Sequence, residues 1–247
     1  MPKHFFFDLD NTLTRSKMAI APEHVPIFKA LTQRVDVTVV SGHGADMIAH
    51  DLSPELGGLY YILGQNGNEA RRKDGTVIWK HELSDAQKAA ARAFITKAKE
   101  YLHLTVKDEN DLIEDRGCEI AYSLIGHHEE QTRKEAFDPT GAIREKLLAD
   151  LSADVIELAH EGVEVRSGGT TVLDMFAEGE NKGYNITLFI TEMHWGKDDC
   201  IYIGDALYEG GNDETVIGII PTHAVAEYRE TYEYLADLLG MPRPVRQ

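Results

Sequence analysis

Two aspartates separated by a single residue stand near the N-terminus, in the stretch HFFFDLDNTLT. If Phe5 to Phe7 form a buried strand, Asp8 ends that strand at an edge where α/β proteins bind ligands. Asp8 can then act as a carboxylate nucleophile towards phosphorus, and Asp10 can reach the same face as a general acid/base. Thr12 adds a hydroxyl to hold a phosphoryl oxygen. Taken alone, the motif also fits an Asp-rich turn that only caps the backbone.

Two further segments carry groups suited to phosphate. Ser41 and Gly42 follow the apolar run VDVTVV, where a hydroxyl and exposed amides can hold a phosphoryl oxygen. An ordinary helix N-cap explains them equally well. Lys182 lies in the polar turn GENKG and can neutralise a phosphorylated nucleophile, although a lone surface lysine is the commoner case.

The segment IYIGDALYEGGNDETV is the most specific of the four. Its strand ends at Asp205, whose carboxylate can bind a hard cation such as Mg²⁺ beside Asp8. Asn212 and Asp213 then close the metal site. The alternative is an acidic surface loop with glycines for flexibility, and the order of the other three segments argues against it.

The composition limits the class of protein. The chain has 247 residues and a formal net charge of −17, which opposes binding to nucleic acid or to an anionic membrane surface. Its two cysteines, Cys118 and Cys200, have no metal-binding spacing, and neither a signal peptide nor a membrane-spanning run is present, so a reduced, soluble, cytoplasmic protein is expected. An acidic protein that binds an anionic substrate must build a local positive site from a metal or a few placed cations.

Both ends of the chain alternate apolar strands with amphipathic helices, which predicts a parallel sheet covered on both faces. The middle differs: GNEARRKDGTVIWKHEL predicts a hairpin that turns at Asp74-Gly75, and LSDAQKAAARAFITKAKEYLHL a long helix capped by Ser84. Further strands and a second helix over residues 137–155 follow. We therefore expect an α/β core over 1–82 and 183–247, interrupted by an α+β insert of antiparallel strands and two helices over 83–182.

These motifs together resemble the haloacid dehalogenase (HAD) superfamily of phosphotransferases, and the longer GGND form resembles its eukaryotic-type phosphomannomutases. The segments RKDGTVIWKHEL, RGCEIAYSLIG, IREKLLADL and GGTTVLDMFAEGENK are similar to cap segments of that group in order and spacing. The resemblance implies a Rossmann-like catalytic core with an inserted type IIB cap that selects the substrate.

The resemblance also implies a Mg²⁺ enzyme that forms an aspartyl-phosphate on Asp8. Asp10 would protonate the leaving oxygen and then activate the acceptor, while Ser41 and Lys182 hold the phosphoryl group. The metal ligands implied are Asp8, the backbone carbonyl of Asp10, and Asp205. This agrees with the chemistry of the residues, because phosphoryl transfer mainly requires positioning and charge neutralisation.

The cap should decide the substrate, and here the sequence departs from the mutase pattern. Arg116 and Asp174 match it, whereas His127 stands in place of an arginine and Val172 in place of a serine. The next expected arginine falls near Arg133-Lys134. Because histidine cannot reproduce the bidentate grip of arginine on phosphate, these changes favour a phosphatase of small phosphomonoesters such as sugar phosphates. Phosphomannomutase is the alternative.

A protein of another class, which binds metal or phosphate without turnover, would usually have lost the nucleophile or the acid/base, and both aspartates are present. The expected partner is a small phosphorylated metabolite. Phosphomannomutase-like proteins often pair through their caps, so the resemblance allows a homodimer, although no apolar stripe in the sequence demands one.

Overall fold

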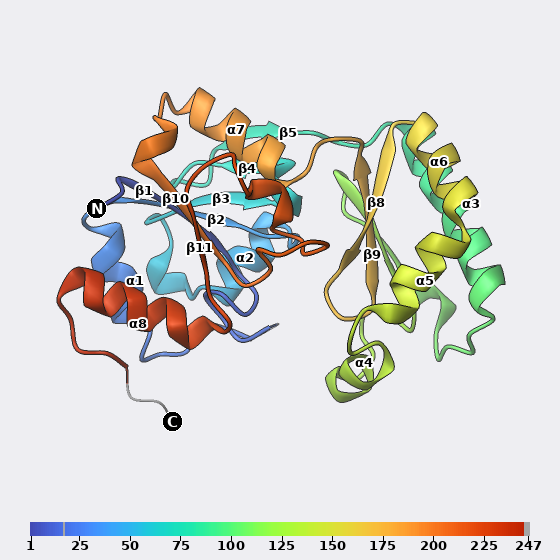
Figure 1. Cartoon of the computed structure of the whole chain (residues 1–247), viewed down its shortest axis with the longest axis horizontal. Coiled ribbons are helices and arrows are strands. Elements are labelled where there is room, and N and C mark those ends of the chain that lie inside the picture. The colour runs from blue at the N-terminus through green and yellow to red at the C-terminus, as the bar shows by residue number, and fades with distance from the viewer. Residues whose placement is uncertain (17, 245–247) are drawn as a thin grey trace. The chain divides into compact units, whose positions relative to one another are not determined.

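The computed structural model of the chain describes residues 1–16 and 18–244. The chain divides into two compact units, a core unit of residues 1–80 and 181–247 and a cap unit of residues 81–180 (Figure 1). The α/β class and the antiparallel insert predicted from the sequence are confirmed.

The core unit is built on a seven-stranded sheet in the order β11-β10-β1-β2-β3-β4-β5. The strands from β11 to β3 are parallel, and β4 and β5 are antiparallel additions. The bounds are β1 His4–Asp8, β2 Asp36–Val40, β3 Tyr61–Gly64, β4 Glu69–Arg71, β5 Val77–Lys80, β10 Cys200–Gly204 and β11 Thr222–Ala224. The predicted hairpin is the β4-β5 pair, and Gly75 in its turn has φ +84°, a left-handed conformation that favours glycine.

Helices cover both faces of this sheet, because consecutive apolar residues of its strands point to opposite faces. Phe5 and Phe7 pack with helices α1, α2 and α8 on one face, where α1 and α8 lie side by side (Figure 1). Phe6 packs with α7 on the other. The bounds are α1 Val25–Thr32, α2 Ala45–Asp51, α7 Lys182–Glu192 and α8 Tyr228–Leu239, with short 3₁₀ turns η1 Pro54–Leu56, η2 Gln65–Gly67, η4 Lys197–Asp199 and η5 Glu214–Val216.

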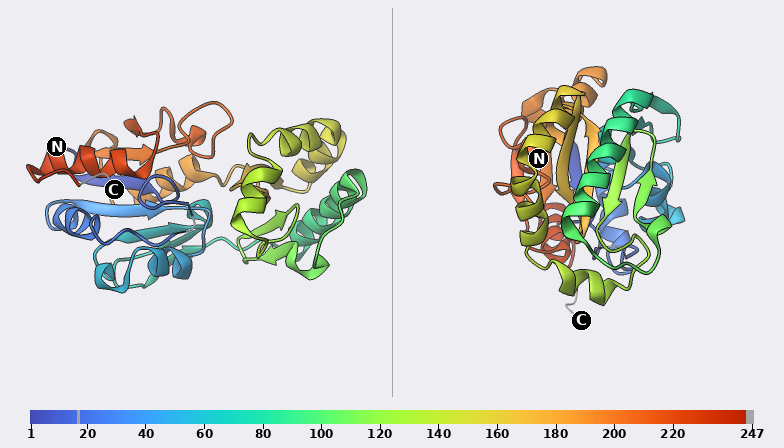
Figure 2. Two further views of the ribbon diagram at one scale, coloured as in Figure 1. Left: turned by 90° about the horizontal axis from the view of Figure 1, so that it is seen from below. Right: turned by 90° about the vertical axis from the view of Figure 1, so that its right-hand side faces the viewer.

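The cap unit has a four-stranded antiparallel sheet in the order β6-β7-β9-β8. One face of this sheet packs against three helices, over residues 85–102, 142–150 and 152–160, to form the cap core, and these helices lie on one side of the sheet (Figures 1 and 2). The bounds are β6 Ile113–Asp115, β7 Glu119–Ser123, β8 Val163–Gly168, β9 Val172–Ala177, α3 Asp85–Leu102, α4 Gln131–Phe137, α5 Ala142–Asp150, α6 Ser152–His160 and η3 Glu109–Asp111.

The cap helices differ in detail from the sequence-based expectation. The long helix is α3, and its predicted cap Ser84 accepts a hydrogen bond from the Gln87 N–H in a full capping box. The expected second helix is two helices, α5 and α6, separated at Leu151, whose ψ of 25° interrupts the helix. Helix α4 has a polar sequence and buries only Lys134 among its residues, which explains why no apolar periodicity indicated it.

Among the described helices, none has the length and apolarity needed to cross a membrane.

Candidate active site

Three adjacent strands of the core sheet carry expected site residues at their carboxyl ends. Asp8 is the last residue of β1, Ser41 follows β2, and Asp205 follows β10. Because β10, β1 and β2 are parallel neighbours, their carboxyl ends lie at one edge of the sheet (Figure 1). The fold therefore brings together three residues that are far apart in the sequence.

Lys182 joins this edge from the first position of α7 and is almost completely buried. Its Nζ donates to Oδ1 of Asp8 at 2.5 Å and to Oδ1 of Asp213 at 2.7 Å. The Tyr202 hydroxyl also donates to Asp213 Oδ1, at 2.6 Å. A buried ammonium thus lies between the expected nucleophile and a second carboxylate, which is the position that charge neutralisation of a phosphoryl group requires.

Asp205 completes a group of three carboxylates. One oxygen each of Asp8, Asp205 and Asp213 lies within 4.8 Å of the others. The Thr12 hydroxyl donates to Asp205 Oδ1 at 3.4 Å, so Thr12 supports this carboxylate. Asn212 is exposed, whereas Asp213 next to it is fully buried. Of the two residues expected to close the metal site, Asp213 therefore lies inside the group.

The electrostatics of this group favour a bound cation. Burial raises the pKa of Asp8 well above its ordinary value; Lys182 opposes this shift, and the charges of Asp213 and Asp205 add to it. Burial and Asp213 also raise the pKa of Asp205. Three buried or half-buried carboxylates with one ammonium have an uncompensated negative charge, which is costly in a low-dielectric site. Oxygen ligands of this kind are those that Mg²⁺ prefers, so the residues fit the expected metal.

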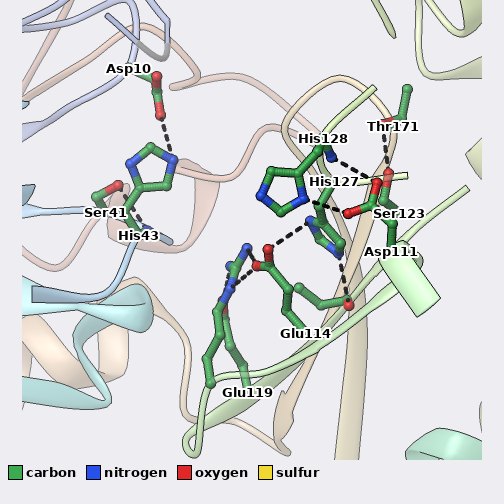
Figure 3. Close-up of polar contacts among 12 residues, drawn as sticks. Asp10, Ser41, His43, Asp111, Glu114, Glu119, Ser123, His127, His128 and Thr171 are labelled. Carbon is green, nitrogen blue, oxygen red and sulfur yellow. Dashed lines mark hydrogen bonds and ion pairs between the residues drawn. The ribbon is translucent and has the colours of Figure 1, made fainter. Parts of the chain in front are cut away.

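Asp10 and the loop after β2 form the exposed side of the same edge. The Asp10 side chain is 30 % exposed, and its Oδ2 lies 3.6 Å from Nε2 of His43 (Figure 3). The hydroxyl of Ser41 accepts the backbone N–H of His43 at 3.1 Å. Gly42 lies between them, and a Cβ placed there would make only ordinary contacts, with the Asn66 side chain. The loop thus presents small residues beside the general acid/base expected at Asp10.

In the cap unit, Arg116 is held by carboxylates of the cap itself. Its Nε and Nη2 donate to Glu114 Oε2 at 3.0 and 2.7 Å, and its Nη1 donates to Glu119 Oε1 at 2.6 Å. Glu119 is fully buried. Burial lowers the pKa of Arg116, but Glu119, Asp174 and Glu114 more than offset this effect and raise it. The guanidinium is therefore a charged group that is already neutralised.

The other expected cap cations also have partners inside the cap. His127 Nε2 contacts the Ala121 carbonyl at 3.2 Å, and its Nδ1 lies 3.6 Å from Glu114 (Figure 3). Burial lowers the pKa of His127, which favours the neutral ring. Arg133 pairs with Glu129, and Lys134 donates to the His127 carbonyl.

Asp174 lies on β9 opposite Ala121 of β7 and Arg166 of β8. A Cβ at Gly168 would lie 1.9 Å from its Oδ2, so glycine is required at that position. Val172 is two residues earlier on the same face of the strand.

With the geometry established, comparison with known proteins identifies the family. The family model described as eukaryotic phosphomannomutase matches residues 25–240. The chain belongs to the eukaryotic phosphomannomutase family. The phosphomannomutase of Triticum aestivum is 30% identical over 223 residues, which cover 85% of this chain and 84% of that protein. The phosphomannomutase of Oryza sativa subsp. indica is 29% identical over 246 residues, 94% of each.

Solved structures share the fold of this phosphomannomutase-family chain. A haloacid dehalogenase-like hydrolase from Bacteroides thetaiotaomicron has a TM-score of 0.58 at 17% identity, covering 89% of this chain and 86% of that one. The IMP-bound, N-terminally truncated IMP-nucleotidase of Plasmodium falciparum has a TM-score of 0.68 at 14% identity, covering 97% and 68%. These structures show the fold, and together with the family assignment they confirm the resemblance to the HAD superfamily and its phosphomannomutases that the motifs predicted.

Sequence reasoning assigned no role to two residues that contact the site. Tyr202 precedes Gly204 by two residues on β10, and its hydroxyl meets Asp213 at the centre of the buried network. A polar residue in an otherwise apolar strand was the available signal. His43 carries no such signal, because nothing in its spacing indicates that its ring faces Asp10.

Proposed function

We propose that this phosphomannomutase-family protein is a Mg²⁺-dependent phosphatase of small phosphomonoesters such as sugar phosphates, and that it acts through an aspartyl-phosphate on Asp8. We favour hydrolysis over the mutase reaction because Arg116 is paired with Glu114 and Glu119. A mutase must hold the second phosphate of a bisphosphorylated intermediate while that intermediate turns round. An arginine neutralised by two carboxylates is poorly suited to that task.

In the first chemical step, a carboxylate oxygen of Asp8 attacks phosphorus and the bond from phosphorus to the leaving oxygen breaks. Asp10, as the acid, gives its proton to that leaving oxygen. In the second step Asp10 takes a proton from water, the water oxygen attacks phosphorus, and the bond to Asp8 breaks to release phosphate. Lys182, held between Asp8 and Asp213, neutralises charge on the phosphoryl oxygens in both steps.

Ser41 and the Gly42 amide would hold a phosphoryl oxygen from the loop after β2. Mg²⁺ held by Asp8, the Asp10 backbone carbonyl and Asp205 would supply further neutralisation of the phosphoryl group, as expected for a hard cation with oxygen ligands. Asp213 would support this group through its hydrogen bonds with Lys182 and Tyr202.

In this proposal the core unit, which includes Lys182, carries out catalysis, and the cap unit selects the substrate. The partner is a small phosphorylated metabolite. Cys118 and Cys200 are both free thiols, which supports a reducing compartment such as the cytoplasm.

Phosphomannomutase is the second candidate, because the family model and the curated relatives carry that name. The test is phosphate release with Mg²⁺ from a panel of sugar phosphates, run beside a coupled assay for conversion of mannose 1-phosphate to mannose 6-phosphate with a bisphosphate activator. Release without isomerisation, abolished in Asp8→Asn, is expected. Isomerisation as the main reaction would support the mutase instead, and no turnover in either assay would support a protein that only binds phosphate or metal.

A further inference from the structure

His43 is held firmly by its backbone in the loop between β2 and α2. Its N–H donates to the Ser41 hydroxyl at 3.1 Å, and its carbonyl accepts the Gln65 N–H at 2.9 Å. The loop enters α2 through the extended Gly44. Two fixed backbone groups leave the ring little freedom beyond its own rotamers.

The ring of His43 lies between two carboxylates, one at each nitrogen. Nε2 is 3.6 Å from Asp10 Oδ2, and Nδ1 is 3.6 Å from Asp51 Oδ2. Both distances slightly exceed a hydrogen bond, as is common for catalytic contacts before substrate binds. Figure 3 shows the ring of His43 directed at the Asp10 carboxylate. One side chain therefore links the expected general acid/base to a residue at the end of α2.

Asp51 is a suitable anchor for the far side of the ring. It is the last residue of α2 and is nearly buried. Burial opposes its ionisation, but the neighbouring His43 and His50 rings lower its pKa below the ordinary value. His50 Nδ1 lies 3.1 Å from the other oxygen of Asp51 and is exposed to solvent. One oxygen of this carboxylate thus faces the His43 ring, and the other faces the exposed His50 ring.

We infer that His43 is a positioning residue: anchored by Asp51, it holds the Asp10 carboxyl group in the orientation needed for proton transfer. This inference rests on the general acid/base role proposed for Asp10. Asp10 is partly exposed, and a ring beside its carboxylate restricts the rotamers that the side chain can adopt. A misplacement of about 1 Å in a catalytic group can cost on the order of 100-fold in rate.

The kinetic test compares two substrates that differ in their need for an acid. When a sugar phosphate is cleaved, the sugar oxygen leaves as a strongly basic alkoxide unless Asp10 protonates it. The p-nitrophenolate released from p-nitrophenyl phosphate is stable without that proton. We expect His43→Ala to lower kcat/KM for a sugar phosphate by about 10- to 100-fold and to change that for p-nitrophenyl phosphate by less than about threefold. The backbone contact with Ser41 is retained in the variant.

Conservative variants separate positioning from a general effect on the loop. His43→Gln places an amide near the Nε2 position and should recover most of the lost rate, whereas His43→Asn reaches only the Nδ1 position and should not. His50→Gln is the matched control, since His50 contacts Asp51 from the exposed side, and it should behave as wild type. Equal losses on both substrates, or no loss in His43→Ala, would overturn the inference.

A measurement that needs no turnover tests the contacts directly. In protein labelled with ¹⁵N-histidine, Asp10→Asn should shift the Nε2 resonance of His43, and Asp51→Asn should shift its Nδ1 resonance. Unchanged His43 resonances in Asp10→Asn would overturn the inference. If the wild-type protein released no phosphate from any substrate, the proposed phosphatase would be refuted, and these resonances would still decide whether His43 holds Asp10.

Discussion

Replacing Lys182 with methionine tests the electrostatic account of the site most directly. Methionine has a similar length and helix propensity, so α7 should still begin at this position. The change removes the ammonium that contacts Asp8 at 2.5 Å and Asp213 at 2.7 Å. Both carboxylates are almost completely buried and would lose the only positive side chain among their direct ion-pair partners in the described residues.

The expected cost follows from this burial. Breaking a buried ion pair by removing one partner typically destabilises a protein by about 3–5 kcal/mol. Since Lys182 opposes the raised pKa of Asp8, its loss should raise that pKa further, and proton uptake by Asp8 limits the cost. We therefore expect the free energy of unfolding of Lys182→Met in EDTA to be about 3 kcal/mol lower than that of wild type. Saturating Mg²⁺ should recover part of the difference, because a cation that binds the folded state stabilises it.

The assay is urea unfolding followed by tryptophan fluorescence. The sequence has two tryptophans, Trp79 and Trp195, and both belong to the core unit, so the signal reports on the unit that contains Lys182. The double variant Lys182→Met/Asp213→Asn should be more stable than Lys182→Met, because it removes one of the unpaired charges. A single variant within about 0.5 kcal/mol of wild type in EDTA, or a double variant no more stable than the single one, would refute the reasoning.

Three further predictions concern other parts of the molecule. Burial lowers the pKa of His24, so the unfolded chain binds a proton that the folded chain excludes, and wild type should lose more stability than His24→Gln between pH 7.5 and 5.5 in urea titrations; parallel curves would contradict this. Glu119→Gln leaves Arg116 with a weaker buried partner and should destabilise the cap by about 1–3 kcal/mol, seen as faster amide hydrogen exchange in residues 119–123; unchanged protection would argue against it. Asp205→Asn should raise the Mg²⁺ concentration for half-maximal phosphate release by about tenfold or more, and an unchanged Mg²⁺ titration would exclude Asp205 as a ligand.

Residues that end core strands were predictable from the sequence because a local pattern specifies them. An apolar run followed by a polar residue marks the end of a buried strand, and parallel neighbours end at one edge. This reasoning needs no side-chain geometry, and it located Asp8, Ser41 and Asp205. It also gave the hairpin of β4 and β5, since Asp74-Gly75 is a local turn signal.

Contacts between particular side chains, and the break in the second cap helix, were not predictable in the same way. The contact of Lys182 with Asp8 joins residues 174 positions apart, and the resemblance suggested it where spacing alone could not. The Arg116 contact with Glu119 spans only three positions, yet it depends on how β7 begins and on rotamers that no periodicity reveals. The same holds for the break at Leu151, where an apolar residue gives no sign that the helix stops.

The distribution of charge explains how a chain with a net charge of −17 can act on phosphate. The cap cations expected to grip a phosphate are engaged with cap oxygens: Arg116 and Arg133 with glutamates, and Lys134 with a backbone carbonyl. In the core unit the carboxylates of Asp8, Asp205 and Asp213 lie together, and Lys182 pairs with two of them, Asp8 and Asp213, so their negative charge favours a divalent cation. Binding of the transferred phosphoryl group then depends on Lys182, loop amides and metal, while the cap has little positive charge left for a second phosphate. This asymmetry favours hydrolysis of a monophosphate over exchange through a bisphosphate.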